Sequence, residues 1–155
     1  MRAALLIAAL LLLPVASASA EVVPGESIAG VEIGMKRGEV KRLLGQPDEV
    51  RRPRHEIFGR FIELRYGRLK VGLFRSDRTV FSVRTTSRRE RTASGVGVGT
   101  RKRGLRRRLE GERCERLEGF RHCFLGRFEA GEIVMDFILT RSNRVKAIRL
   151  IRVID

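Results

Sequence analysis

Hydrophobic and polar residues alternate along much of the chain, and a period of two is typical of β-strands that bury one face. Ile62, Leu64 and Tyr66 alternate with charged neighbours, and a similar alternation returns around Met135 and Phe137. The pattern predicts four strands in the first half of the chain, at 49–52, 60–66, 69–75 and 79–86. It predicts four more in the second half, at 113–117, 120–127, 132–140 and 144–153.

Residues 35–44 have a helical period instead. Val40, Leu43 and Leu44 fall on one face of this predicted helix, and basic residues fall on the opposite face. The glycine and proline that follow are typical of a helix end. A second, weaker helix is expected after Thr100, which would act as its N-cap.

The chain contains an internal repeat. The stretch 27–45 returns 65 residues later as 92–110, in the same order and with conservative replacements. A repeat of this kind is one supersecondary unit used twice. The motif residues for which we expect structural roles are Gly30, Gly34, Leu44, Gly45, Pro47, Gly95, Gly99 and Leu109.

Each unit is therefore predicted to be a short helical element followed by an antiparallel meander. The expected fold class is α+β, with two tandem units whose helices lie on one face of the sheet or sheets. The expected boundaries are a signal peptide at 1–20, a polar and loosely held lead-in at 21–26, the first repeat at 27–87, a linker at 88–93 and the second repeat at 94–155.

The first twenty residues have the pattern of an export signal. Arg2 precedes an apolar run over 3–16, and the sequence from Ala18 to Ala20 is an A-x-A cleavage site. The alternative is an uncleaved anchor, but the run is shorter than the roughly 20 residues that a spanning helix needs. We expect a secreted or extracytoplasmic protein in which no other stretch is apolar enough to span a membrane.

Both cysteines lie in the second repeat. The segment 113–127 is interpreted as a hairpin, in which Cys114 faces Cys123 in a non-hydrogen-bonded pair. A disulfide is therefore expected after export. The alternative is a metal site in which His122 joins the two sulfurs at an unusual C-x7-H-C spacing, and we favour the disulfide and expect no metal.

Residues 28–47 carry a family resemblance, in the pattern I-x-x-x-x-I-G-M-K-R-G-E-V-x-x-L-L-G-x-P. This pattern resembles the signature of the small outer-membrane-assembly lipoprotein fold, and related repeats are paired in the β-lactamase inhibitory protein family. The resemblance implies helical elements packed on an antiparallel sheet that presents a face to a partner protein. A disulfide just after the second helix is also similar to the inhibitor family.

Charge is the strongest compositional signal. The chain of 155 residues has 33 Lys and Arg and a formal net charge of +15, which favours anionic partners. Arginine suits phosphate because its planar fork donates two parallel hydrogen bonds. The alternative is an ordinary solvated surface in an arginine-rich protein. The candidate anion-binding residues are Arg88, Arg89, Arg91, Arg101, Lys102, Arg103, Arg106, Arg107 and Arg108.

Other chemistry has less support. Gly95, Gly97 and Gly99 precede the basic helix, and we interpret them as turn glycines, with an incidental anion site as the alternative. His55 and His122 lie near no catalytic motif, so we expect a protein that is not an enzyme and has no cofactor.

The predicted function is a secreted, non-catalytic binding module in the cell envelope. Its expected partner is a protein, an anionic envelope polymer or a lipid surface, and specific binding of intracellular nucleic acid is not expected. The alternatives are an inhibitor of an extracytoplasmic enzyme, similar to the β-lactamase inhibitors, and a structural envelope protein.

Overall fold

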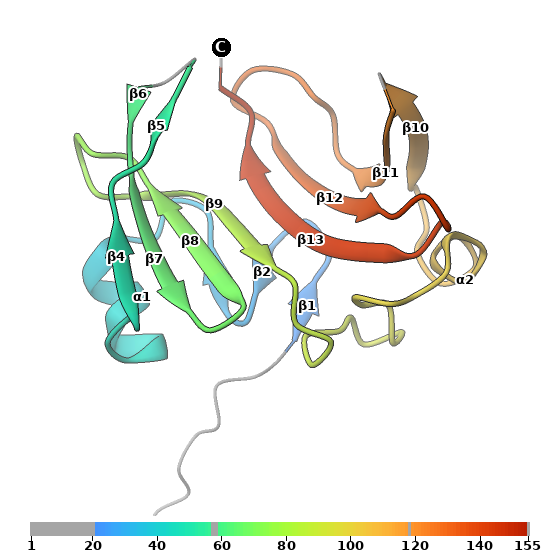
Figure 1. The fold of residues 1–155 in the computed structure, drawn as a ribbon, viewed down its shortest axis with the longest axis horizontal. Helices are drawn as coiled ribbons and strands as arrows, with labels where there is room; N and C mark the ends of the chain where they lie inside the picture. The colour runs from blue at the N-terminus through green and yellow to red at the C-terminus, as the bar shows by residue number, and fades with distance from the viewer. Residues whose placement is uncertain (1–20, 57–58, 118, 155) are drawn as a thin grey trace, which may run out of the picture.

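An eight-stranded antiparallel sheet dominates the structure, a computed structural model that describes residues 21–56, 59–117 and 119–154 (Figure 1). The signal peptide predicted at 1–20 lies outside the described residues. Across the sheet the strands lie in the order β10, β11, β12, β13, β9, β8, β7, β4. Their bounds are β4 (Glu49–Arg51), β7 (Ile62–Tyr66), β8 (Leu69–Leu73), β9 (Val80–Thr85), β10 (Arg113–Leu117), β11 (Phe120–Leu125), β12 (Ile133–Leu139) and β13 (Val145–Arg152).

The eight strands predicted from alternation correspond to these eight strands, with ends that agree within two residues. Their side chains alternate between a buried face and an outer face. In one registered row Cys123, Phe137, Ile148, Thr85 and Leu69 lie on neighbouring strands, and each is 5% exposed or less. This row belongs to the buried face, which carries the hydrophobic core.

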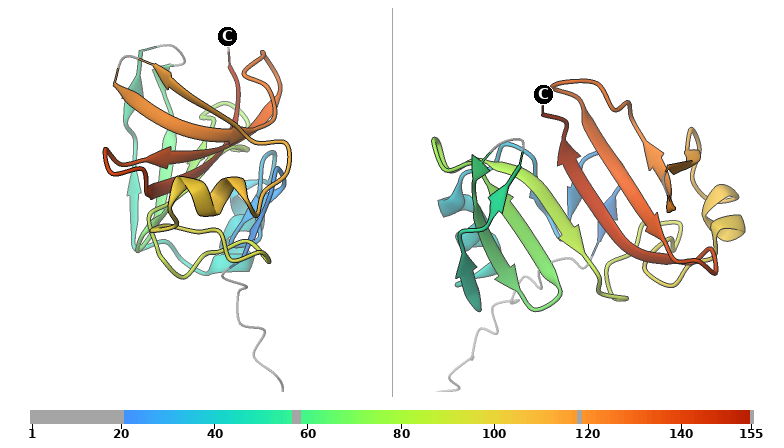
Figure 2. Two further views of the ribbon diagram at one scale, coloured as in Figure 1. Left: turned by 90° about the vertical axis from the view of Figure 1, so that its right-hand side faces the viewer. Right: turned by 45° about the horizontal axis from the view of Figure 1, so that its top comes forward.

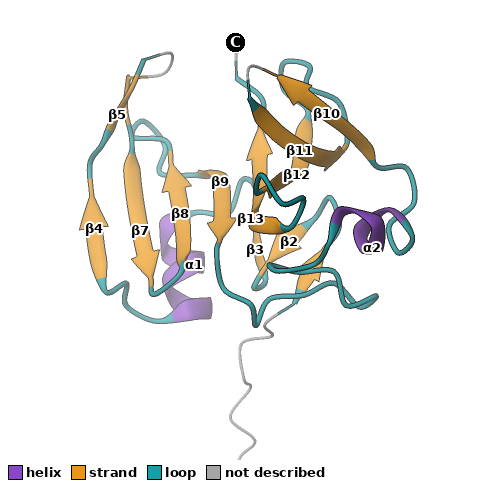
Figure 3. Cartoon of the chain, turned by 45° about the vertical axis from the view of Figure 1, so that its right-hand side comes forward, coloured by secondary structure: helices purple, strands orange, loops and turns teal. Residues whose placement is uncertain are grey.

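The expected α+β class is wrong, because the described residues are mostly in strands and their two helices do not form a layer on the sheet. Helix α1 (Arg37–Leu44) has eight residues and α2 (Lys102–Arg106) has five, and they lie far apart (Figure 3). Each helix buries one side chain, Val40 in α1 and Leu105 in α2. Leu43 is 40% exposed, so the apolar stripe is too narrow to cover a sheet.

A small second sheet and loops cover the core instead. Its strands, in the order β1 (Val22–Val23), β2 (Ser27–Ile28) and β3 (Val31–Glu32), lie behind the middle of the large sheet in Figure 1. Val22, Ile28 and Val31 have no exposed surface. The loop before α2 adds Val96 and Val98, which are also buried.

The lead-in at 21–26 is therefore not loosely held, because β1 forms part of the cover over the core. Val22 pairs with Ile28 and its amide donates to the carbonyl of Arg91 at 2.8 Å. A further ribbon that the alternation did not predict joins β5 (Arg54–His55) to β6 (Gly59–Arg60) in the connection between β4 and β7.

The two halves of the chain meet through their last strands. The N-terminal half contributes β4, β7, β8 and β9, the C-terminal half contributes β10, β11, β12 and β13, and β9 pairs antiparallel with β13 in the middle (Figure 2). Arg84 faces Arg149 at this junction, and the flanking pairs are Val83 with Leu150 and Thr85 with Ile148.

Corresponding backbone contacts recur in the two halves. The amide of Gly34 donates to Val80 at 2.8 Å, and that of Gly99, 65 residues later, donates to Val145 at 2.7 Å. Each valine donates in return to the residue after its glycine, at 2.8 and 2.9 Å. Both glycines have left-handed φ angles, 93° and 94°. These matches support the duplication, which stays a prediction.

The helix ends and turns agree with the sequence in part. Gly45 follows α1 with a φ of 82°, as expected of a C-terminal glycine. The predicted N-cap at Thr100 is wrong, because α2 begins one residue later and the Thr100 hydroxyl accepts from the amide of Gly97. In the described residues no helix combines the length and the apolar character needed to cross a membrane.

Candidate functional site

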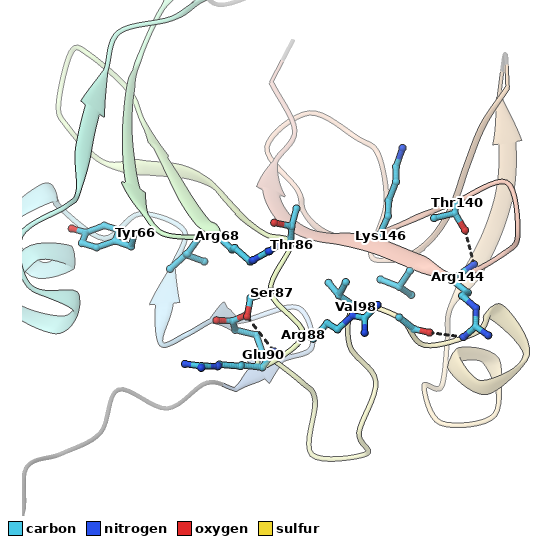
Figure 4. A pocket seen from close by; sticks show the side chains of 14 residues that line it. Tyr66, Arg68, Thr86, Ser87, Arg88, Glu90, Val98, Thr140, Arg144 and Lys146 are labelled. Carbon is cyan, nitrogen blue, oxygen red and sulfur yellow. Dashed lines mark hydrogen bonds between the residues drawn. The ribbon is translucent and has the colours of Figure 1, made fainter.

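A cavity of about 910 Å³ lies at the end of the sheet where the two halves meet (Figure 4). Its wall comes from the turn after β7, the segment after β9, the loop before α2 and the turn between β12 and β13. We call it the basic cavity, after the charged residues of its lining: Arg68, Arg88, Arg89, Glu90, Arg144 and Lys146.

Hydroxyl groups fix the segment after β9. The buried Thr85 hydroxyl donates to the carboxylate of Glu90 at 3.0 Å and accepts from the amide of Ser87 at 3.0 Å. The Ser87 hydroxyl in turn accepts from the amide of Arg89 at 3.1 Å. This turn leaves the side chains of Arg88 and Arg89 exposed at the cavity.

The opposite wall is fixed by the turn between β12 and β13. Asn143 takes the left-handed position with a φ of 56°, a conformation that asparagine tolerates. The amide of Arg144 donates to the Thr140 hydroxyl at 3.1 Å, and its guanidinium donates to the Gly99 carbonyl at 3.1 Å. Arg144 therefore ties the turn to the loop before α2, and its charge stays at the cavity.

The charge of the basic cavity is largely uncompensated. Among the described residues, none of its five cationic side chains makes an ion pair with a carboxylate. Glu90 is the single acidic residue of the lining, and its carboxylate is turned to Thr85. A cavity walled by cations on two sides attracts anions and concentrates their field.

Tyr66 supplies a neutral polar group to the same wall. Its hydroxyl donates to the Gly45 carbonyl at 3.2 Å, and burial raises the pKa of the phenol. The side chain therefore stays protonated at neutral pH and adds no negative charge to the basic cavity.

The sequence-predicted cations occupy two places. Arg88 and Arg89 line the basic cavity, and Arg91 joins Arg88 and Arg144 at an adjoining cavity of about 270 Å³. The others surround α2, where two smaller cavities of about 590 and 480 Å³ are lined by Arg101, Lys102, Arg103, Arg106, Arg107 and Arg108. In this second group Arg106 forms an ion pair with Glu112 at 3.2 Å.

Sequence reasoning missed Arg68, Arg144 and Lys146. Arg68 and Arg144 lie in or next to a β-turn and Lys146 is the second residue of β13, so all three fall outside the dense cluster of arginines. The strands predicted on either side of each turn were the available signal. If the two hairpins belong to one sheet, the turn at 67–68 and the turn at 140–144 can lie at the same end of it.

The glycine-rich segment before α2 is not arranged as a phosphate loop. The amide of Gly95 donates to Thr92, that of Gly97 to the Thr100 hydroxyl and that of Gly99 to Val145. These three donors are therefore already satisfied. A side chain at Gly97 would also lie 2.8 Å from the Glu90 carbonyl, which explains this glycine by close packing.

The predicted disulfide is confirmed. Cys114 and Cys123 face each other in the β10–β11 hairpin and are bonded, with their Cα atoms 3.9 Å apart. The bond uses both sulfurs, so the alternative metal site with His122 is wrong. A disulfide is typical of proteins that fold outside the reducing cytosol.

A second polar group lies on the outer face, at some distance along the sheet from the basic cavity. His122 is 4% exposed, and its Nδ1 is 2.9 Å from the fully buried carboxylate of Asp136. Arg149 donates to the other oxygen of that carboxylate at 2.8 Å. The rings of Phe120, Phe124 and Phe128 surround the imidazole, whose buried Nε2 has no hydrogen-bond partner among the described residues.

No protein-family model matches the chain, and no curated protein matches it. Among solved structures, the fold is similar to that of a cysteine-rich secretory protein from Staphylococcus aureus, with 15% identity and a TM-score of 0.46 over 77% of this chain and 44% of that one. It is also similar to an extracellular protein with an SCP domain from Bacillus anthracis (13% identity, TM-score 0.48, 77% and 44% covered).

A third similar structure is a DUF4309 family protein from Bacillus subtilis, at 16% identity and a TM-score of 0.48, with 81% of this chain and 84% of that one covered. The chain spans less than half of the first two proteins. Similarity at this level assigns neither a family nor a function. The resemblance to the lipoprotein and inhibitor families stays a prediction.

Proposed function

We propose that the protein is an exported, non-catalytic binding module that holds a polyanionic partner in the cell envelope through the basic cavity. The observation that carries the proposal is the set of five unpaired cations that line one cavity from both halves of the sheet. The disulfide supports a place outside the cytosol.

Phosphate-bearing partners fit this cavity better than a hydrophobic protein interface does. Of the large hydrophobic side chains that are exposed in the described residues, Leu43, Val50, Phe120 and Phe128, none lines the cavity. Protein interfaces depend on such anchors, whereas phosphate contacts depend on arginine and lysine. The inhibitor and structural alternatives stay predictions.

The test measures binding of long-chain inorganic polyphosphate to the exported, disulfide-bonded protein at about 50 mM salt. The triple variant Arg88→Ala, Arg89→Ala, Lys146→Ala removes three cations of the basic cavity. We expect its dissociation constant for polyphosphate to rise at least tenfold. Each cation that contacts a phosphate releases counterions on binding, and each substitution removes that contribution to affinity.

The matched control is Arg52→Ala, Arg60→Ala, Arg116→Ala, which removes three exposed cations from other places. It lowers the net charge by the same amount, and we expect less than a threefold change. Equal losses in the two variants would mean that net charge alone attracts polyphosphate. Absence of binding to the unsubstituted protein would overturn the proposal itself.

A further inference from the structure

A row of cations crosses the outer face at the centre of the large sheet. Lys70 on β8 faces Arg84 on β9, and Arg84 faces Arg149 on β13. The row continues to Arg65 on β7 at one end and to Asp136 on β12 at the other. Figure 1 shows these five strands side by side. All five residues alternate with core-facing neighbours, so they share one face.

The charges of this row do not balance at its centre. Arg149 donates to Asp136 at 2.8 Å, and Arg65 donates to two carboxylates of its own half. Among the described residues Lys70 and Arg84 make no ion pair. Like charges directly opposite on neighbouring strands destabilise a sheet. The stability of the fold therefore does not account for three cations, Lys70, Arg84 and Arg149, side by side across three strands.

Two donors at the same place lack acceptors. The Nε atoms of Arg84 and Arg149 are both buried, and neither has a hydrogen-bond partner in the part of the chain that the structure describes. A buried donor without an acceptor costs free energy that a bound acceptor would recover. The excess charge and the unpaired donors lie at the same place, and both favour the binding of an anion at the centre of the row.

We propose that the centre of the outer face binds an oxyanion, a phosphate or carboxylate group, between Lys70, Arg84 and Arg149. The pairing of β9 with β13 creates this site, because it places Arg84 of the N-terminal half opposite Arg149 of the C-terminal half. None of the three residues lines the basic cavity, so this site is separate from the one assigned to the polyanion.

The test follows the Nε–H resonances of Arg84 and Arg149 in nitrogen-15 spectra of the whole chain. Sodium phosphate and sodium malonate are titrated separately, and sodium chloride keeps the ionic strength constant. We expect saturable shifts of both resonances with at least one probe, and the probe that binds more tightly identifies the source of the oxyanion. Shifts that grow linearly with both probes, or no shifts, overturn the proposal.

Substitution separates binding from a structural role. Lys70→Met and Arg84→Met remove a charge and keep an apolar stem that can still pack. Each should raise the melting temperature in chloride buffer, because repulsion in the row is relieved, and should weaken the probe at least fivefold. A structural role predicts lower melting temperatures instead, and that result would overturn the proposal.

Lys146→Met is the control, since it lowers the charge by the same amount within the basic cavity. It should leave the shifts of Arg84 and Arg149 unchanged. If polyphosphate binding at the basic cavity fails while these shifts persist, the oxyanion site stands and the proposed function does not. If the shifts fail while polyphosphate binds, the reverse holds.

Discussion

The carboxylate of Asp136 is fully buried and accepts hydrogen bonds from Arg149 and His122. Its replacement by alanine should therefore be strongly destabilising. The change removes a charge-assisted bond from Arg149, worth about 1.5–3 kcal/mol. It also leaves the Nδ1 donor of His122 buried without an acceptor, at about 1–3 kcal/mol. The Arg149 side chain is 32% exposed, so its charge still reaches water. We therefore expect a loss of about 3–4 kcal/mol in the free energy of unfolding.

The assay is urea unfolding at neutral pH, with an unchanged m-value as the sign that the folded state is otherwise intact. Asp136→Asn keeps an acceptor for His122 and should lose about half as much, roughly 1.5–2 kcal/mol. A double-mutant cycle with Arg149→Met should give a coupling of at least about 1 kcal/mol. A loss below about 1 kcal/mol for Asp136→Ala, or additive effects in the cycle, would refute this account of the buried network.

Two further predictions concern the disulfide and an acid-sensitive turn. Replacing both Cys114 and Cys123 with alanine should lower the free energy of unfolding by about 2.5 kcal/mol, which is the loop-closure entropy for a sequence separation of 9. Urea unfolding of the variant and of the unsubstituted protein, with and without reductant, checks this prediction. Equal stability of the variant and the oxidised unsubstituted protein would contradict it. The Thr79 amide and hydroxyl donate hydrogen bonds to the Asp77 carboxylate and lower its pKa. The carboxylate therefore stabilises the fold above its unfolded pKa of about 3.9. This stabilisation is lost as the pH falls through the lower pKa of the folded state. Asp77→Ala should therefore lower the melting temperature at pH 7 and flatten its decline below about pH 4, and an unchanged melting curve across this range would contradict the assignment.

The large sheet was predictable because its strands are long enough to show their period. From Ile62 to Tyr66 and from Ile133 to Leu139, alternation shows which residues face the core, and the register of Cys114 with Cys123 follows from the hairpin that joins their strands. Alternation does not report the details of the turns. In the turn between β8 and β9 the left-handed position is taken by Arg78, with a φ of 59°.

The cover over the core was not predictable by the same means. The strands β1, β2 and β3 have two residues each, which is too short to show any period. The helical period of 35–44 is real, but the sequence does not say that α1 buries only Val40 fully and adds only the partly buried Leu44 beside it. Because these short segments cover the core, the α+β expectation failed even though the strands were placed correctly.

The candidate site was half predictable for a related reason. Charge density along the chain identified Arg88 and Arg89, because they are adjacent to other arginines. Arg68 and Arg144 come to the same cavity through sheet topology, which sequence density does not report. The sequence places His122 beside the cysteines and near no catalytic motif, whereas its partner Asp136 lies on the neighbouring strand.

A comparison of the two helices supports a binding role for the charge. In α1 the Glu39 carboxylate accepts from the amide of Lys36 at 2.7 Å and so caps the first turn. The corresponding residue 65 positions later is Gly104, and the position that corresponds to Leu43 is Arg108. The second helix thus lacks this cap and has a denser run of neighbouring like charges, and both differences disfavour a helix. The binding of an anionic partner that we propose would account for these two differences.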